Sequence, residues 1–294
     1  MTFIIGCSNA ENLCRKAARL ANVKLARSET KIFPDGDLYV RVDGNLEGEK
    51  VLLVQSGYPN QNSALMELFL ALDAVKDMDP KRVSVMLAYM PYSKQDRRFK
   101  GGEAVSAGTV LKLIKGLGAD RFYAINLHFA GGRADFHFFN VGVRNLNAAP
   151  LVADYVGSKY GDFTAVLPGK GSNYLLTDNV IPLETRRQEY RASGGRYFGG
   201  SGILGKDIDV GGKTVLVLDD IVSTGGTMAK ACDMMRRKGA KRVISACIHG
   251  LFVDGAVKKL ENAGADEIIS TDTIESGFSK VSVAPLIAGV VKKI

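Results

Sequence analysis

The sequence predicts an α/β protein with two domains, each a largely parallel sheet flanked by helices. Short β-branched runs alternate along the chain with longer segments whose apolar residues follow helical spacing, which is the pattern of βαβ units. The chain has 294 residues, enough for about two domains of ordinary size. Hydrophobic residues make up 46% and charged residues 24%, so each domain can bury a core.

The expected strands alternate with the expected helices in chain order. The strands are Thr2–Ile5, Lys50–Val54, Arg82–Ala88, Arg121–Ile125, Thr164–Leu167, Thr214–Leu218, Arg242–Cys247 and Glu267–Ser270. The helices are Ala10–Ala21, Ser63–Lys76, Ala104–Leu117, Ala149–Ser158, Thr227–Lys238 and Ala256–Ala263. Strands joined by helical crossovers pair in parallel, and helices then cover both faces of the sheet.

Two segments depart from this alternation. Pro34-Asp35-Gly36 is a turn signal between two strand-like runs within residues 31–42, so a hairpin is expected there, outside the parallel order. Gln188–Gly212 carries eight glycines and no periodicity, which predicts a long loop acting as a lid or a linker. Its position directly after Arg186 and Arg187 favours the lid.

A weak internal repeat indicates where the domains divide. Gly118-Ala119-Asp120 and Gly264-Ala265-Asp266 each follow a strand that opens with Lys-Arg-Val, about half the chain apart. This favours two related domains, residues 1–145 and 146–294. The alternative is that Gly-Ala-Asp is a common helix-to-strand turn.

Charge and composition narrow the function. Lys and Arg number 39 against 31 Asp and Glu, a net charge of +8, which favours anionic partners. The basic residues are spread along the chain, so nucleic-acid binding is not expected. No apolar run is long enough for a membrane span, and the N-terminal stretch lacks the basic region of a cleaved signal peptide. The four cysteines show no metal-ligand spacing and are expected to be reduced thiols of a cytoplasmic protein.

The segment Asp219–Thr227 carries the strongest chemical signal. A hydrophobic strand leads to two adjacent carboxylates, and a turn of small residues then opens a helix. Glycines let backbone N–H groups approach a phosphate, and the helix N-terminus favours the anion. The carboxylates would be repelled by that phosphate, so sugar hydroxyls or a divalent cation are their expected partners. The alternative is a set of helix-capping residues and turn glycines.

This segment resembles the ribose-5-phosphate-binding loop of phosphoribosyltransferase folds. Together with Phe33-Pro34-Asp35-Gly36-Asp37 and Tyr92-Ser93-Lys94-Gln95-Asp96-Arg97, it makes the chain similar to the ribose-phosphate diphosphokinase family, the phosphoribosyl pyrophosphate (PRPP) synthetases. His249-Gly250-Leu251-Phe252 and Thr271-Asp272-Thr273 extend the resemblance, of the short archaeal type, over nearly the whole chain. It implies two phosphoribosyltransferase-type domains, with ATP-side motifs in the first and the ribose-5-phosphate loop in the second.

The resemblance also implies site residues, a cofactor and partners. The residues implied for ribose 5-phosphate are Asp219, Asp220, Ser223, Thr224, Gly225, Gly226 and Thr227. Those implied for ATP are Phe33, Asp35, Asp37, Lys94, Gln95 and Arg97, and the adenine pocket is commonly shared across a subunit contact, so a homo-oligomer is expected. Arg187 and His128 are implied as catalytic, with Mg²⁺ as the cofactor and His128 as its ligand.

Several positions depart from the family pattern. Asn126 and Gly169 stand where relatives have Asp, Thr185 where they have Lys, Asp37 where they have Glu and Lys94 where they have Arg. Lys170 or Arg186 could restore the positive charge that Thr185 lacks. For Lys94–Lys100 the alternative is a solvated charge run, and for His128 a buried or capping histidine.

These departures leave more than one functional hypothesis open. One is an active enzyme that makes PRPP and AMP from ATP and ribose 5-phosphate. Another is a non-catalytic homologue that binds a phosphoribosyl ligand or nucleotide and regulates or assembles with a paralogue. A third is a related transferase that uses a phosphoribosyl substrate.

Overall fold

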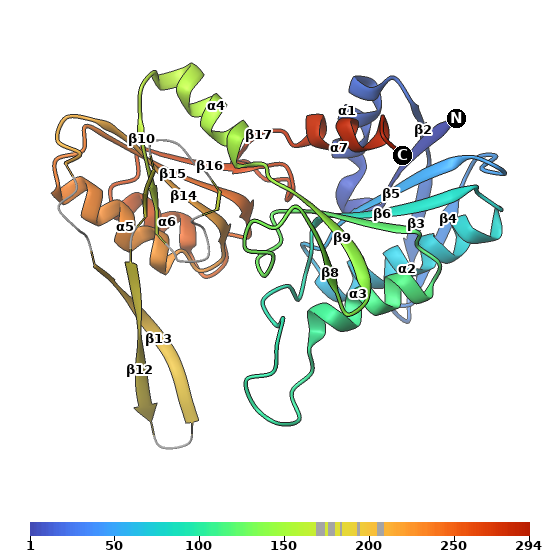
Figure 1. The fold of residues 1–294 in the computed structure, drawn as a ribbon, viewed down its shortest axis with the longest axis horizontal. Helices are drawn as coiled ribbons and strands as arrows, with labels where there is room; N and C mark the ends of the chain where they lie inside the picture. The colour runs from blue at the N-terminus through green and yellow to red at the C-terminus, as the bar shows by residue number, and fades with distance from the viewer. Residues whose placement is uncertain (169–173, 176–179, 183, 193–194, 205–208) are drawn as a thin grey trace. The chain divides into compact units, whose positions relative to one another are not determined.

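The computed structural model describes residues 1–294 except 169–173, 176–179, 183, 193–194 and 205–208, and within 180–204 it describes the backbone alone (Figure 1). The chain divides into two compact units. Unit 1 comprises Met1–Ala148, Asp272–Glu275 and Ser282–Ile294, and unit 2 comprises Ala149–Thr271 and Ser276–Val281. Residues 272–275 and 282–294, which the sequence assigns to the second domain, therefore cluster with unit 1.

Unit 1 is built on a seven-stranded sheet of order β2-β1-β5-β6-β7-β9-β8. Its strands are β1 (Thr2–Gly6), β2 (Lys24–Ala26), β5 (Lys50–Ser56), β6 (Arg82–Tyr89), β7 (Arg121–Ile125), β8 (Asp135–Phe138) and β9 (Val141–Leu146). All neighbouring pairs are parallel except β8 and β9. The central strands are apolar on both faces, as parallel strands covered by helices require.

Helices cover both faces of this sheet, α1 and α7 one face and α2 and α3 the other (Figure 1). The helices of unit 1 are the short 3₁₀ helix η1 (Ser8–Ala10), α1 (Glu11–Ala21), α2 (Gln61–Asp77), α3 (Ser106–Gly116) and α7 (Ala284–Val291). Helix α1 ends at Ala21, and the next residue, Asn22, has a left-handed backbone and donates its N–H to the Arg19 carbonyl of the last turn. The separate hairpin of β3 (Ser28–Ile32) and β4 (Leu38–Val42) is antiparallel, which confirms the turn predicted at Pro34-Asp35-Gly36.

Unit 2 has a six-stranded parallel sheet of order β11-β10-β14-β15-β16-β17. Its strands are β10 (Thr164–Leu167), β11 (Val180–Pro182), β14 (Thr214–Val222), β15 (Arg242–Gly250), β16 (Glu267–Thr271) and β17 (Ser279–Val281). Its helices are α4 (Ala149–Tyr160), α5 (Gly226–Arg237) and α6 (Ala256–Asn262). The two units confirm the predicted fold class of mostly parallel sheets flanked by helices.

Two expectations need correction. Most of the segment predicted as a loop, Gln188–Gly212, forms part of an antiparallel hairpin of β12 (Glu184–Ala192) and β13 (Gly195–Leu204). Its glycines concealed the strand pattern, because a glycine adds no side chain to the alternation. The strand predicted to end at Leu218 continues as β14 to Val222. Asp219 and Asp220 are therefore strand residues, near the carboxyl end of β14.

None of the helices in the described ranges has both the length and the apolar character of a membrane span.

Candidate functional site

The segment Asp219–Thr227 lies at the carboxyl end of β14 in unit 2, and there the carboxylates are held by the sheet. Asp219 pairs with Cys247 of β15, and the Asp220 N–H donates a hydrogen bond of 2.9 Å to Asp219 Oδ1. Asp220 is only 3% exposed, whereas Thr224 and Gly226 are exposed. Asp219 and Asp220 therefore lie largely buried at the end of β14, and the turn of small residues that follows them is exposed to solvent at Thr224 and Gly226.

The turn between β14 and α5 depends on Gly225. Its φ is +75°, a left-handed conformation, and a Cβ there would lie 3.1 Å from the Cβ of Ala256. Two contacts from the neighbouring segment fix the turn, because Val253 N–H donates to the Ser223 carbonyl at 3.0 Å and Lys259 Nζ donates to the Thr224 carbonyl at 3.3 Å. Glycine is thus required here by both backbone angle and space.

The first turn of α5 offers N–H groups for an anion. The hydrogen bond at its start runs from Ala229 N–H to the Gly225 carbonyl at 2.8 Å, and the first N–H groups of a helix point out of its N-terminus. The hydroxyls of Ser223 and Thr224 stand beside this terminus. A helix N-terminus flanked by hydroxyls binds phosphate, and the adjoining carboxylates accept hydrogen bonds from hydroxyls.

The β3–β4 turn of unit 1 presents Phe33 with Asp35 and Asp37. Phe33 is 49% exposed, and its ring contacts Tyr39 edge-on, with 6.3 Å between the ring centroids. The turn is tied by Phe33 N–H to the Asp37 carbonyl at 2.8 Å and by Asp37 N–H to Asp35 Oδ1 at 3.2 Å. An exposed aromatic ring in the same turn as two carboxylates suits a base that stacks and donates from its amino group.

This hairpin is anchored by Glu67, a residue that sequence analysis missed. Glu67 lies on α2 with 3% exposure, and its carboxylate accepts four hydrogen bonds. The donors are Ser8 N–H, Ser8 Oγ, Thr30 Oγ1 and Gln55 Nε2, at 2.6 to 2.8 Å. They come from η1, β3 and β5. A lone carboxylate among the apolar positions of a predicted helix was the available signal.

Lys94, Gln95 and Arg97 lie together in the loop between β6 and α3. The Gln95 carbonyl accepts from Ala107 N–H at 3.2 Å, which joins the loop to the start of α3. Lys94 and Arg97 are exposed, and within the described residues neither forms an ion pair; the Arg97 guanidinium lies 5.3 Å from the Phe99 ring centroid. The loop therefore presents two uncompensated cations.

The end of this loop is closed by Glu103. Its carboxylate accepts from the N–H groups of Phe99 and Lys100 at 2.8 and 3.0 Å. These backbone hydrogen bonds hold the pKa of Glu103 below its usual value. The carboxylate is thus used to shape the loop.

His128 is half-buried in the turn after β7, next to Asn126. Asn126 is 1% exposed and uses both ends of its amide: Nδ2 donates to Asn147 Oδ1 at 2.9 Å, and Oδ1 accepts from Ala148 N–H at 2.8 Å. An aspartate could not make the first of these bonds. Asn126 therefore ties the turn to the chain after β9 and supplies no charge.

The surroundings of His128 bear on the metal expected there. Within the described ranges no three His, Cys, Asp or Glu side chains are grouped to hold a metal ion. Mg²⁺ prefers oxygen ligands and often keeps several waters while binding substrate phosphates. His128 therefore has no cluster of carboxylate ligands beside it among the described residues, and Mg²⁺ there would need oxygen ligands from water or a bound phosphate.

Arg187 lies on β12 of unit 2, opposite Ser201 of β13, with Thr185 and Arg186 on the same strand. Gly169 and Lys170 lie outside the described residues. Each group of predicted residues is assembled within its own unit: the β3–β4 turn, the β6–α3 loop and His128 in unit 1, and the Asp219–Thr227 loop and Arg187 in unit 2.

Comparison with known proteins gives consistent matches. Residues 2–118 match the family model of the N-terminal domain of ribose phosphate pyrophosphokinase, and residues 175–283 match the phosphoribosyl transferase domain. The ribose-phosphate pyrophosphokinase of Methanothermobacter thermautotrophicus is 37% identical over 98% of this chain and 99% of its own. That of Sulfolobus acidocaldarius is 36% identical over 99% of both chains. The crystal structure of phosphoribosylpyrophosphate synthetase from Mycobacterium smegmatis superposes with a TM-score of 0.81, at 29% identity over 99% of this chain and 97% of that one.

Proposed function

Because the chain belongs to the ribose-phosphate pyrophosphokinase family, we propose that it transfers diphosphate from ATP to ribose 5-phosphate, giving PRPP and AMP. The observation that carries this proposal is the Asp219–Thr227 loop, where two carboxylates and a helix N-terminus stand at one strand end. This donor and acceptor set matches a ribose that bears a 5-phosphate.

In this proposal each end of the loop binds a different part of ribose 5-phosphate. The first turn of α5, with Ser223, Thr224 and Thr227, holds the 5-phosphate, while Gly225 and Gly226 let the backbone approach it. Asp219 and Asp220 accept hydrogen bonds from the ribose hydroxyls. This leaves the 1-hydroxyl as the nucleophile, held in a fixed orientation.

ATP is assigned to the two loops of unit 1. Phe33 stacks on adenine, and Asp35 and Asp37 accept from its amino edge. Lys94, Gln95 and Arg97 contact the phosphates, where two cations without carboxylate partners offset the charge. In the reaction the ribose 1-hydroxyl oxygen bonds to the β-phosphorus and its proton is released to water, while the bond from that phosphorus to the α,β-bridging oxygen breaks and AMP leaves.

Mg²⁺ bound to the nucleotide supplies charge neutralisation on the phosphate oxygens. His128 is assigned to this ion through its water shell, because imidazole is a poor direct ligand for Mg²⁺. Arg187 is assigned to the charge that develops on the transferred group. Asn126, whose amide is fully used within the turn, contributes to shape only.

A homo-oligomer is part of this proposal. Ile32, Phe33 and Tyr39 expose apolar surface on one hairpin, and a second copy that covers this surface would complete the adenine pocket. A paralogue could occupy the same surface.

The decisive experiment is a direct assay of AMP and PRPP from ATP, ribose 5-phosphate and Mg²⁺, with calorimetric binding of each substrate. Equimolar AMP and PRPP are expected. Binding of ribose 5-phosphate without turnover would refute the catalytic proposal and favour the non-catalytic homologue. A purified Asp233→Ala variant, changed on the exposed side of α5, is the matched control for mutations at Asp220.

A further inference from the structure

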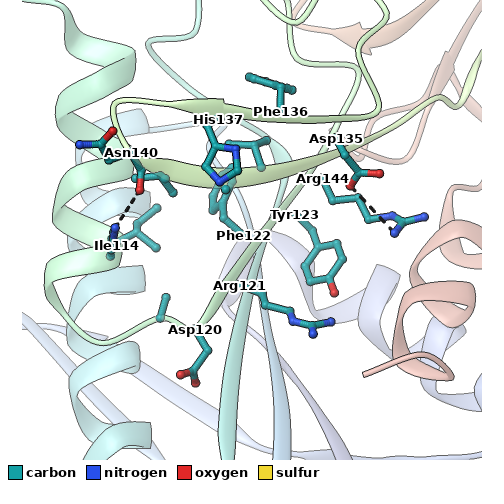
Figure 2. Close-up of a pocket in the computed structure, with 15 residues that line it drawn as sticks. Ile114, Asp120, Arg121, Phe122, Tyr123, Asp135, Phe136, His137, Asn140 and Arg144 are labelled. Carbon is teal, nitrogen blue, oxygen red and sulfur yellow. Dashed lines mark hydrogen bonds and ion pairs between the residues drawn. The ribbon is translucent and has the colours of Figure 1, made fainter.

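A pocket of about 580 Å³ lies along β7, β8 and β9 of unit 1, outside the loops assigned to ATP (Figure 2). Strand pairing sets Tyr123 beside Arg144, Arg144 beside Asp135, and Gly142 beside His137. Paired residues project to the same face of a sheet. The three strands therefore present one polar face. Their other face contributes Phe122, Phe136 and Val143 to the core or its border, and these three side chains also line the pocket.

Tyr123 supplies a hydroxyl to the pocket. It is 5% exposed and lines the pocket, yet its hydroxyl has no hydrogen-bond partner among the described residues. Solvent reaches this hydroxyl at the pocket, because it is not one of the buried side-chain atoms that lack a partner. Figure 2 shows this hydroxyl on the same side of β7 as the Arg121 side chain. The hydroxyl is therefore open to an acceptor that enters the pocket.

Arg121 supplies an uncompensated cation at the same place. It is exposed, and in the described ranges it has no ion pair. The neighbouring charges are engaged elsewhere: Asp120 Oδ2 accepts from Val83 N–H at 2.7 Å, and Lys115 Nζ donates to the Asn140 carbonyl at 2.7 Å. Arg144 and Asp135 approach only to 3.9 Å, too far for a hydrogen bond.

His137 stands over the centre of the polar face. A Cβ built on Gly142 would lie 3.6 Å from His137 Nε2, so the imidazole occupies the space that glycine leaves. The ring lines the pocket together with Arg121 and Tyr123. A ligand that enters the pocket should therefore change the environment of the His137 ring.

We propose that this pocket binds a small, hydroxyl-bearing phosphate ester. The Arg121 guanidinium and the Tyr123 hydroxyl donate to phosphate oxygens, a role for which arginine is well suited. Asp135, largely exposed beside Arg144, accepts from hydroxyls of the organic part. The volume lies within the range of small-molecule sites and exceeds what a phosphate ion alone fills.

The three histidines of the chain make a site-specific test possible. The full-length protein, labelled on histidine, is titrated with glucose 6-phosphate, inorganic phosphate and glucose while the ring signals are followed by NMR; the His137→Asn variant assigns the signal. We expect a saturable shift of the His137 signal with glucose 6-phosphate, weaker binding of inorganic phosphate and none of glucose. The signals of His128 and His249 should stay unchanged.

Variants separate this site from the proposed synthetase reaction. Arg121→Gln should weaken glucose 6-phosphate binding at least about ten-fold, and Tyr123→Phe by about three-fold or more. Arg19→Gln removes the same charge at an exposed position of α1, and this variant should bind glucose 6-phosphate like the parent protein. All three should retain AMP and PRPP formation.

The proposal is overturned if His137 does not respond up to about 10 mM glucose 6-phosphate, a limit already weaker than ordinary ligand affinities. It is also overturned if Arg121→Gln binds as tightly as Arg19→Gln, or if inorganic phosphate binds as tightly as the ester. Because the NMR readout needs no turnover, a shift of His137 in a protein without synthetase activity would refute the proposed function alone.

Discussion

The segment from β5 to β7 in unit 1 and the segment from β14 to β16 in unit 2 share the same interactions. In unit 1, Asp120 accepts from Val83 N–H at 2.7 Å and returns a hydrogen bond to the Val83 carbonyl. In unit 2, Asp266 does the same with Val243, at 2.8 Å in each direction. Both aspartates close a Gly-Ala-Asp turn against the neighbouring strand.

The glycines of these turns also correspond. Gly118 follows α3 and Gly264 follows α6, both with positive φ, and a Cβ on either would meet a long basic side chain from the helix before that one, α2 or α5. That side chain is Lys76 in unit 1, at 3.0 Å, and Arg236 in unit 2, at 3.1 Å. The turns are thus equivalent in backbone and in packing.

The two segments differ at the end of their first strand. At the end of β5, Gln55 and Ser56 are buried and bonded within unit 1, Gln55 to Glu67 and Ser56 to the Thr273 carbonyl. At the end of β14, two carboxylates and a turn of small residues stand in the corresponding place. The same scaffold therefore carries internally bonded Gln and Ser side chains at one strand end and two adjacent carboxylates followed by a small-residue turn at the other.

The largest effect on stability is expected from Glu67→Ala. The change leaves donors from Ser8, Thr30 and Gln55 without their acceptor in a buried place, so the free energy of unfolding should fall by about 3 kcal/mol. Urea unfolding followed by circular dichroism measures the loss. Glu11→Ala, on the exposed side of α1, should cost less than about 0.5 kcal/mol. Equal losses in the two variants would show that the hydrogen bonds of Glu67 at the end of β5 do not stabilise unit 1.

At the other strand end, Asp220→Ala should act on ligand binding. Loss of the acceptor for a ribose hydroxyl should weaken ribose 5-phosphate binding at least about 100-fold, the effect typical of an unpaired polar contact to substrate. Calorimetry measures it beside the Asp233→Ala control. Unchanged affinity would contradict the assignment of Asp220.

The shared turns give a paired prediction. Asp120→Ala should cost about 1 kcal/mol by removing the bond to Val83 N–H, and Asp266→Ala somewhat more. The difference arises because Asp266 also pairs with Arg236 at 2.5 Å, although this ion pair is largely exposed. Thermal unfolding of both variants checks the order. The reverse order would show that the two turns are not equivalent.

The smallest effect concerns the cysteines, which are buried in both units. Burial raises the pKa of Cys232 to about 12, from 9.0 for a free thiol. A thiol that ionises less readily in the folded state stabilises it fully below pH 9, and this contribution declines as the pH rises from 9 toward 12. A thiol reagent at pH 8 should therefore label none of the four cysteines until the protein is unfolded.

The strands and helices with a strong apolar pattern could be predicted from the sequence. Elements with a weak pattern, or whose packing partner is distant in the sequence, were missed. Strands β8 and β9 were missed because polar residues such as His137 and Arg144 alternate on an open face. Helix α7 was missed because Ala284–Val291 is apolar nearly all round. It packs against α1, a partner from the opposite end of the chain that no local pattern reveals.

The residues of the candidate site also differ in how far the sequence predicts them. The Asp219–Thr227 loop could be predicted because its chemistry is contiguous in the sequence. Glu67 could not, since its importance arises from donors on three separate elements. Asn126 was interpreted as a lost carboxylate, whereas in the structure its amide is a tie between two segments.

Unit 1 includes two segments from the C-terminal part of the chain, Asp272–Glu275 and Ser282–Ile294. Asp272 accepts from Lys16 Nζ, Ser282 Oγ and Val283 N–H, and α7 packs on α1. During synthesis on the ribosome, residues 1–148 therefore emerge with one face of their sheet incompletely covered until unit 2 has been made. Nascent unit 1 should bind chaperones that recognise apolar surface, and should be released only when residues 284–291 have left the exit tunnel.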